Sequence, residues 1–507
     1  MLPGRERRLV TTALMLGSLL AALEATAVAA AVPTAVGSMG GVSRYSWVFS
    51  AYLLTSTTTV PLYGKLADLF GRRRIYLIAV ALFVGGSALS GFSGSLSQLI
   101  VFRAIQGLGA GGLMPVAATV IGDIFTLEER GRMQGLFAAV WAFASLVGPL
   151  VGGLFTDTLS WRAIFFLGVP FGLLSAWMLH RHLKEEPPRR EHRLDVLGTV
   201  LLSLAVTLLL LGLIEGPEVW GWGDSRTIGT LAGALLLTLA FLWQERRAPE
   251  PMLPLDLFQN RVIAVSCVGN ALLGALLFAL TAFGPILGQG VLGGSATDAG
   301  ALLSPVLIGW PLSSTITGRL MNRFSYRRFC LIGGLLLAGS GVALARLSAA
   351  TTRLEVLAIL FVMGLGLGFV SMPYMIAVQS AVPWRLRGVA TGSVQFFRSI
   401  GGAVGVAALG ALFASRLAQA VGPDVDANAL LDPGKRAAMG ALEMSQLSGA
   451  FLLALHAVFW GIGAIAVASL LVAFWFPAGK PRELAWVDPE RASDASDPTV
   501  QPLEIPH

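Results

Sequence analysis

The stretch GKLADLFGRRR at Gly64–Arg74 decides the fold, because a related stretch, GRLMNRFSYRR, follows at Gly318–Arg328. The first glycine, the basic residue after it and the final pair of arginines keep their order across an offset of 254 residues. A second set repeats at an offset of 257: Gly107, Leu108, Gly109, Gly111, Arg130, Gly131 and Gly135 return as Gly364, Leu365, Gly366, Gly368, Arg387, Gly388 and Gly392. Two offsets this similar indicate two halves with the same topology, arranged as a parallel repeat.

Long apolar runs make up both halves. Of the 507 residues, 55% are hydrophobic and only 13% are charged, whereas an ordinary soluble domain is about 25% charged. About 20 apolar residues are needed to cross a hydrocarbon layer about 30 Å thick. Fourteen runs are long enough, near 9–32, 45–66, 74–92, 97–121, 132–156, 162–181, 194–214, 226–244, 262–288, 297–320, 328–346, 354–379, 388–414 and 450–476. The sequence therefore predicts an all-α polytopic membrane protein with fourteen transmembrane helices.

Six of the runs fall in each half, and two lie between the halves. We expect an N-terminal six-helix bundle at 1–190, two extra transmembrane helices at 191–247, a C-terminal six-helix bundle at 248–478 and a cytoplasmic tail at 479–507. The first run follows three arginines, as in a signal peptide, but it is too long for one and leads directly into further spans. The segment from about 415 to 448 is expected to be a long external loop with little regular structure.

The positive charges predict the orientation of the chain. If the N-terminus is cytoplasmic, most of the 36 Lys and Arg residues fall in cytoplasmic segments. The external segments then hold only Arg44, Arg162, Arg226, Arg346, Arg353, Arg416, Lys435 and Arg436. Because basic residues collect in cytoplasmic loops, we expect both termini in the cytoplasm and the protein in the cytoplasmic membrane. The same rule accounts for the formal charge of +7, so no nucleic-acid partner is implied.

Three charged residues lie well inside the predicted spans, away from their ends: Glu24, Arg103 and Arg398. A charge at the bilayer centre costs about 2.5–3.5 kcal/mol on insertion scales, so such a residue is expected to be functional. At 1.5 Å per residue, Glu24 lies roughly 12 Å and Arg103 roughly 9 Å from the external ends of their spans. Their similar depth predicts an ion pair. The pair either carries out proton exchange or is static and only orients the helices.

Longer patterns around these residues carry a family resemblance. Gly64, Asp68, Gly71 and Arg72 match the signature loop between the second and third helices of the major facilitator superfamily. Nearly the whole chain resembles the fourteen-span drug:proton antiporter branch of that family. The resemblance implies that this loop locks a cytoplasmic gate, with Asp123 as its acidic partner and Arg130 nearby.

The resemblance extends to the helices that carry the intramembrane charges. Leu23–Pro33 is similar to the branch's helix-one motif, with Glu24 in place of aspartate and Ala29 in place of asparagine. Arg103 and Gln106 belong to an Arg-x-x-Gln-Gly pattern that the resemblance links to proton transfer. A proton arriving at Glu24 is therefore expected to weaken its hold on Arg103 or Gln106 and to bias the exchange between inward-open and outward-open states.

A small-residue stripe resembles the antiporter motif of the branch. It consists of Gly148, Pro149, Gly152 and Gly153, with Ala144 in place of a glycine. Small residues at helical spacing let two helices approach closely, and proline kinks the span. Gln289, Gly293, Gly300 and Pro305 also resemble the family.

A substrate cavity is expected between the two bundles. Arg398 lies near the middle of its span, where it could meet Glu24 or an anionic part of a substrate. Candidate lining residues are Trp141, Tyr374 and Phe397, although such residues are more often ordinary helix packing.

Other sources of energy and chemistry lack their motifs. A phosphate loop ends in Gly-Lys-Ser/Thr, but Lys65, Lys435 and Lys480, which follow glycine, precede Leu, Arg and Pro. The histidines and the two cysteines show no metal-ligand spacing. We therefore expect no enzyme, no metal and no cofactor, with the proton motive force as the energy source.

Taken together, the residues and the resemblance predict a proton-coupled antiporter that exports amphiphilic, hydrophobic or cationic small molecules, acting as a monomer. One alternative keeps the fold and makes a lipid or another amphiphilic metabolite the cargo. A second alternative is a membrane scaffold or sensor that transports nothing.

Overall fold

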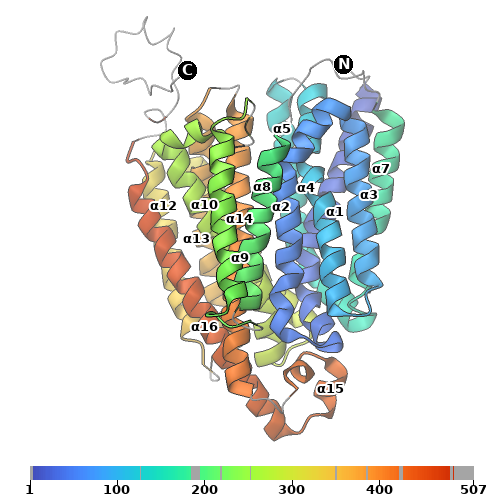
Figure 1. The fold of residues 1–507 in the computed structure, drawn as a ribbon, viewed down its shortest axis with the longest axis vertical. Helices are drawn as coiled ribbons and strands as arrows, with labels where there is room; N and C mark the ends of the chain where they lie inside the picture. The colour runs from blue at the N-terminus through green and yellow to red at the C-terminus, as the bar shows by residue number, and fades with distance from the viewer. Residues whose placement is uncertain are drawn as a thin grey trace, which may run out of the picture. The chain divides into compact units, whose positions relative to one another are not determined.

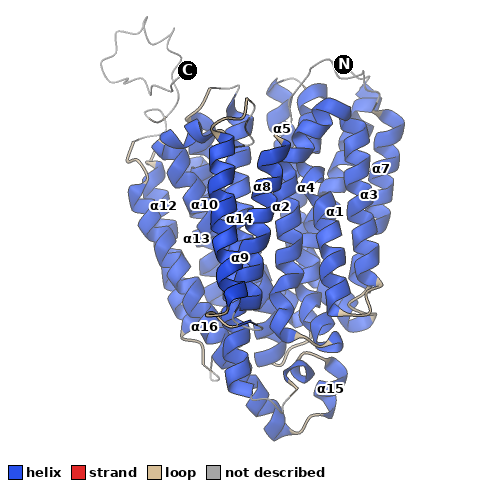
Figure 2. Cartoon of the chain, viewed as in Figure 1, coloured by secondary structure: helices blue, strands red, loops and turns tan. Residues whose placement is uncertain are grey.

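The computed structural model describes residues 4–125, 127–183, 195–216, 220–249, 251, 253–321, 323–348, 351–383, 386–421, 426–479 and 484. This part of the chain contains helices and loops and no strand (Figure 2). The α-helices are α1 Gly4–Met39, α2 Tyr45–Phe70, α3 Arg72–Gly91, α4 Leu96–Ile124, α5 Leu127–Thr158, α6 Ala163–Leu167, α7 Val169–His182, α8 Val196–Glu215, α9 Ser225–Glu245, α10 Arg261–Ile286, α11 Ala296–Leu320, α12 Tyr326–Ala345, α13 Arg353–Ser380, α14 Arg387–Val421, α15 Pro433–Ala438 and α16 Ala441–Trp475. Short helical turns are η1 Val42–Arg44, η3 Leu255–Gln259, η4 Leu287–Val291 and η6 Ala427–Leu430.

Twelve helical segments of the described chain are long and apolar enough to cross a membrane. The two predicted spans outside these twelve, near 45–66 and 132–156, coincide with α2 and α5. These helices are 26 and 32 residues long and include residues whose side chains are not described. The prediction of an all-α membrane protein is confirmed.

Two segments differ from the sequence-based expectation. The span predicted at 162–181 is present as Ala163–His182, but it is interrupted at Gly168 between α6 and α7, because Pro170 has no N–H to continue the first helix. The predicted loop at 415–448 is largely helical, since α14 runs to Val421 and α16 begins at Ala441. Between them, Asp432 caps α15 by accepting from Gly434 N and Lys435 N.

Contacts divide the chain into two compact units. The first unit is Met1–Met252 with Leu280–Ser304 and Val406–Leu455. The second unit is Leu253–Ala279 with Pro305–Gly405 and His456–His507. The first unit thus contains the first half and the extra pair α8 and α9, together with one end of α10, α11, α14 and α16 from the second half.

Glycines let α4 lie directly against two neighbours in the first unit (Figure 1). Gly107 and Gly111 face α2, where an added Cβ would lie 2.1 Å from a threonine Oγ1 in each case. Gly109 faces α3, where a Cβ would lie 2.3 Å from Phe83 N. Any larger residue would push these helices apart, so the glycine pattern determines the spacing.

The repeat predicted from the sequence recurs as packing in the second unit. In α13, Gly364 and Gly368 face α11, and Gly366 faces α12. A Cβ at Gly368 would lie 2.0 Å from Ser313 Oγ. The second unit therefore packs α13 against α11 and α12 as the first unit packs α4 against α2 and α3.

The small-residue stripe of α5 packs against α1. A Cβ at Gly148 would lie 2.0 Å from Thr26 Oγ1, and a Cβ at Gly152 would lie 2.2 Å from Ala27 O. Thr26 Oγ1 also donates to Ala144 O across the interface, at 3.1 Å. The two backbones are therefore almost in contact at this point of α1.

Gly152→Ala is expected to lower the thermal unfolding midpoint of the detergent-purified protein. The new methyl meets the backbone of Ala27, and overpacking of this kind costs about 1–3 kcal/mol. The matched control is Gly229→Ala in α9, where a Cβ meets no atom within 4 Å. Equal midpoints for the two variants would contradict this account of the α1–α5 interface.

Candidate functional site

Glu24 and Arg103 form an ion pair in the interior of the first unit. Arg103 Nη1 lies 2.9 Å from Glu24 Oε1. The exposed fractions of the two residues are 3% for Glu24 and 2% for Arg103. The pairing expected from their similar depths is therefore present, between α1 and α4.

Arg103 has three further partners. Its Nη1 donates to Gln106 Oε1 at 2.6 Å, one turn along α4, and its Nε donates to Val48 O at 3.4 Å. Its guanidinium carbon lies 4.2 Å from the centre of the Tyr52 ring, close enough for a cation–π interaction. Gln106 Nε2 is buried and has no acceptor among the described residues. The arginine is thus held by neutral groups of α2 and α4 as well as by the carboxylate.

This arrangement can respond to a proton. A buried ion pair that loses one charge leaves the other uncompensated, at a cost of about 3–5 kcal/mol. If Glu24 takes up a proton, Arg103 keeps only its neutral partners and becomes free to seek another acceptor. An ionised Glu24 and a protonated Glu24 would therefore hold Arg103 by different contacts.

Helix geometry explains why Glu24 faces α4. Thr26 and Ala27 lie against the small residues of α5. At 3.6 residues per turn, Glu24 lies about 160° around the helix from Thr26 and about 60° from Ala27. Close packing of these two residues on α5 thus turns the carboxylate away from α5, toward Arg103.

The predicted cytoplasmic gate is described only in part. Gly71 joins α2 to α3 with φ 89°, a left-handed conformation that favours glycine, and Arg72 begins α3. The backbones of Gly64 and Asp68 are in α2, that of Asp123 is in α4 and that of Arg130 is in α5. The packing of Gly64 and the side chains of the other three lie outside the described part of the structure, so their role stays a prediction.

The candidate cavity residues lie in different surroundings. Trp141 packs against Ala22, Leu23 and Ala144 in the first unit. Tyr374 is fully buried in the second unit, with its ring 5.6 Å from that of Phe476.

The two remaining candidates are neighbours on α14. Phe397 is partly buried, with its ring centre 5.6 Å from that of Phe258. The guanidinium of Arg398 lies over the Trp310 ring, 4.7 Å from its centre.

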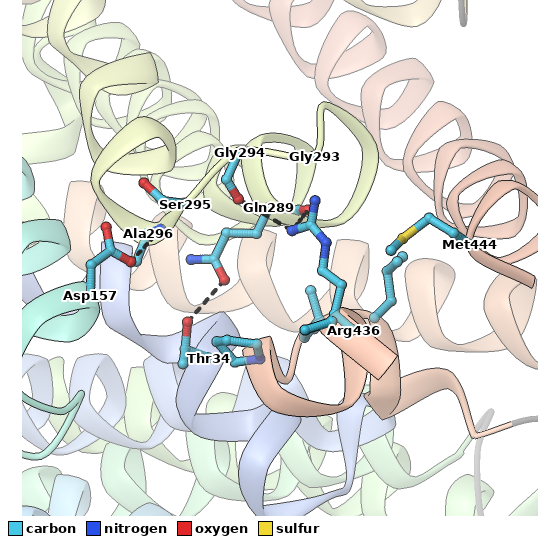
Figure 3. A pocket seen from close by; sticks show the side chains of 13 residues that line it. Thr34, Asp157, Gln289, Gly293, Gly294, Ser295, Ala296, Arg436 and Met444 are labelled. Carbon is cyan, nitrogen blue, oxygen red and sulfur yellow. Dashed lines mark hydrogen bonds between the residues drawn. The ribbon is translucent and has the colours of Figure 1, made fainter. Parts of the chain in front are cut away.

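A cavity of about 440 Å³ lies at one end of the first unit (Figure 3). Beside it, Asp157 of α5 accepts from Ala296 N at 3.0 Å, Thr297 N at 2.8 Å and Thr297 Oγ1 at 2.5 Å. Three donors at the start of α11 thus converge on one carboxylate. An anion at a helix N-terminus is also favoured by the helix dipole. Asp157 therefore fastens α5 of the first half to α11 of the second half.

Two more side chains join elements at this cavity (Figure 3). Gln289 accepts from Thr34 Oγ1 and donates to Ala30 O, both at 3.0 Å. Arg436 donates to Gln289 O at 3.0 Å and to Gly294 O at 3.3 Å. Of the residues that join elements here, only Gln289 could be singled out from the sequence, because it belongs to the family resemblance. Asp157 and Arg436 act on residues about 140 positions away, and neither periodicity nor a local motif indicates such contacts.

Asp157→Ala is expected to lower the thermal unfolding midpoint in detergent, because the N-terminus of α11 loses its cap. Loss of a capping side chain costs about 0.5–2 kcal/mol. Asp256→Ala is the matched control, since Asp256 is exposed and accepts only from Gln259 Nε2, at 3.2 Å. A midpoint for Asp157→Ala as high as that of the control would show that the contact does not hold α5 to α11.

Comparison with known proteins agrees with this architecture. Two curated relatives from Bacillus subtilis (strain 168) are similar in sequence. Multidrug transporter protein MdtP is 36% identical over 411 residues, which is 81% of this chain and 76% of the relative. Multidrug resistance protein 3 is 35% identical over 403 residues, which is 80% of this chain and 79% of the relative.

Solved structures show the same fold. A bacterial homolog of the human lysosomal transporter Spinster, in an inward-facing and unoccupied conformation, aligns with a TM-score of 0.68 at 14% identity, covering 96% of this chain and 99% of its own. A D-xylose–proton symporter aligns with a TM-score of 0.60 at 15% identity, covering 94% and 98%. A family profile described as Major Facilitator Superfamily matches residues 14–406. With these matches and its repeated glycine-packed helices, the chain belongs to the Major Facilitator Superfamily.

Proposed function

We propose that the protein is a proton-coupled antiporter that exports amphiphilic, hydrophobic or cationic small molecules from the cytoplasm by alternating access. The observation that carries the proposal is the buried Glu24–Arg103 pair, at 2.9 Å. One relative named as a multidrug transporter and one named as a multidrug resistance protein support export of small molecules. The protein would cross the cytoplasmic membrane fourteen times, with both termini inside, and need no cofactor beyond the proton gradient.

In this proposal, Glu24 exchanges the proton. Arg103 binds the ionised carboxylate and relaxes toward Gln106, Val48 O and Tyr52 when the carboxylate is neutral. Loss of the Arg103–Glu24 ion pair would loosen the contact between α4 and α1. Because α1 packs closely on α5, this change would reach the antiporter motif at Gly148, Pro149, Gly152 and Gly153. Protonation of Glu24 thereby shifts the equilibrium between the inward-open and outward-open states, because the contacts of Arg103 differ between them.

The two ends of the protein would open in turn. With the proposed orientation, the end that holds Asp157 and Arg436 is external, and their contacts keep that end closed. Gly64, Asp68, Gly71, Arg72, Asp123 and Arg130 would hold the cytoplasmic end closed in the other state. The protein would complete this cycle as a monomer.

Glu24→Gln is expected to abolish export driven by a pH gradient, because the amide has no proton to exchange. The measurement uses proteoliposomes with an imposed pH gradient and follows a cationic dye and a labelled lipid in parallel. Glu443→Gln is the matched control, since Glu443 is an exposed carboxylate at the start of α16.

Three outcomes of this experiment contradict the proposal. Gradient-driven dye movement that is unaffected by Glu24→Gln rules out Glu24 as the proton site. Lipid movement without dye movement selects a lipid exporter on the same fold. Movement of neither cargo favours a membrane scaffold or sensor.

Arg103→Ala is expected to uncouple transport while leaving a path for substrate. Dye should still exchange down its own gradient, but a pH gradient should no longer drive its accumulation. Removal of one partner leaves Glu24 uncompensated, at about 3–5 kcal/mol, so the double variant Glu24→Gln/Arg103→Ala should unfold at a higher temperature than Arg103→Ala alone. Full coupling in Arg103→Ala would mean that the pair only orients α1 and α4.

A further inference from the structure

Arg398 is an intramembrane cation without a counter-charge in the described chain. It lies about a third of the way along α14, within the second unit. Its described contact is the cation–π interaction with Trp310, at 4.7 Å. No hydrogen bond or ion pair of its guanidinium occurs among the residues that the structure describes. Glu24, the acidic partner that the sequence suggested, is engaged by Arg103.

The position of Arg398 is held firmly by its neighbours. α10 packs directly on its backbone, since a Cβ at Gly274 would lie 1.9 Å from Arg398 O. The ring beneath the guanidinium is also anchored, because Trp310 Nε1 donates to Ser371 Oγ at 3.0 Å. Four helices of the second unit, α10, α11, α13 and α14, thus converge on this one cation. Such a preorganised group loses little entropy when a ligand binds.

The guanidinium keeps some solvent-accessible surface at its nitrogens. Its nitrogens are not among the buried polar atoms that lack a partner, and the residue is only partly buried. Water or a ligand can therefore reach the donors. An arginine inside a membrane protein is costly unless an anion or polar acceptors compensate it, and its planar fork matches a carboxylate, sulfonate or phosphate.

Apolar side chains lie next to the cation along α14. Phe397 precedes it on α14 and packs with Phe258 against a buried cluster that includes Val394 and Val378. An acidic head group on Arg398 would therefore have apolar side chains next to it for a hydrophobic tail.

We propose that Arg398 binds the anionic group of an amphiphilic substrate, with Trp310 covering the other face of the guanidinium. This inference rests on the proposed export function and extends its cargo from cations to acidic amphiphiles. The anionic group belongs either to a free amphiphile or to an anionic phospholipid, because a sulfonate, a carboxylate and a phosphate present the same acceptors to the arginine.

The test compares two ligands with the same tail and opposite heads. Radiolabelled dodecylsulfonate and dodecyltrimethylammonium are bound at equilibrium to the full-length protein in phosphatidylcholine nanodiscs, without a pH gradient. Arg398→Gln is expected to weaken sulfonate binding about tenfold to hundredfold, as for loss of hydrogen bonds to a charged group. Ammonium binding should stay within about twofold, because that head has no acceptor for the arginine.

Further variants separate the guanidinium from charge in general. Arg398→Lys should bind the sulfonate with intermediate affinity, since it keeps the charge and loses the fork. Arg416→Gln is the matched control, because Arg416 is an exposed arginine on the same helix. If Arg398→Gln does not fold, Trp310→Leu tests the same site with the charge intact. It should weaken sulfonate binding by about twofold to fivefold through loss of the cation–π contact.

The outcomes distinguish the inference from the proposed function. The anion site is overturned if Arg398→Gln weakens binding of the sulfonate and the ammonium ligand equally, or weakens binding of neither. Sulfonate binding that depends on Arg398, without gradient-driven export in proteoliposomes, supports the site and overturns the proposed coupling. Competition by phosphatidylglycerol in the nanodiscs would assign the site to a lipid head group, and its failure to compete would assign the site to a free amphiphile.

Discussion

Close contact between helix backbones is the constraint on which the rest of this structure depends. Lipid tails are as apolar as leucine, so helices in a bilayer gain little from burying apolar side chains against one another. Contact instead comes from small residues that let backbones approach. Gly109 reaches α3, Gly152 reaches α1 and Gly274 reaches α14, each at a separation that would not admit a methyl group. These approaches orient the helices that carry the intramembrane charges.

The charged residues show what that orientation provides. Glu24 and Arg103 lie on different helices, and they meet while a separate face of α1 packs on α5. The pair is nearly inaccessible, whereas Arg398 is only partly buried and lies against an anchored tryptophan. One arginine thus has an internal acid as its partner, and the other has no acidic partner among the described residues. This difference in environment is the physical basis for assigning proton exchange to the first and ligand binding to the second.

Much of the fold could be predicted from the sequence because a membrane helix is recognisable from a local run of apolar residues. Runs of apolar residues predicted the spans, and the glycine repeat predicted equivalent packing, which α4 and α13 both show. The break between α6 and α7 was missed because the run stays apolar through Gly168 and Pro170. The helical extensions of α14 and α16 were missed because hydropathy reports where a membrane span ends and not where a helix ends.

The candidate site was predictable where its residues are charged and lie within apolar runs. Glu24, Arg103 and Arg398 could be singled out from the sequence alone, since charges within apolar runs are costly. Tertiary structure decided their partners, the complete burial of Tyr374 and the capping of α11 by Asp157. The physical reason is that a helix apolar on all sides carries no periodic signal of which face meets which neighbour. Those faces are set by the shapes of glycine-lined surfaces brought together from distant parts of the chain.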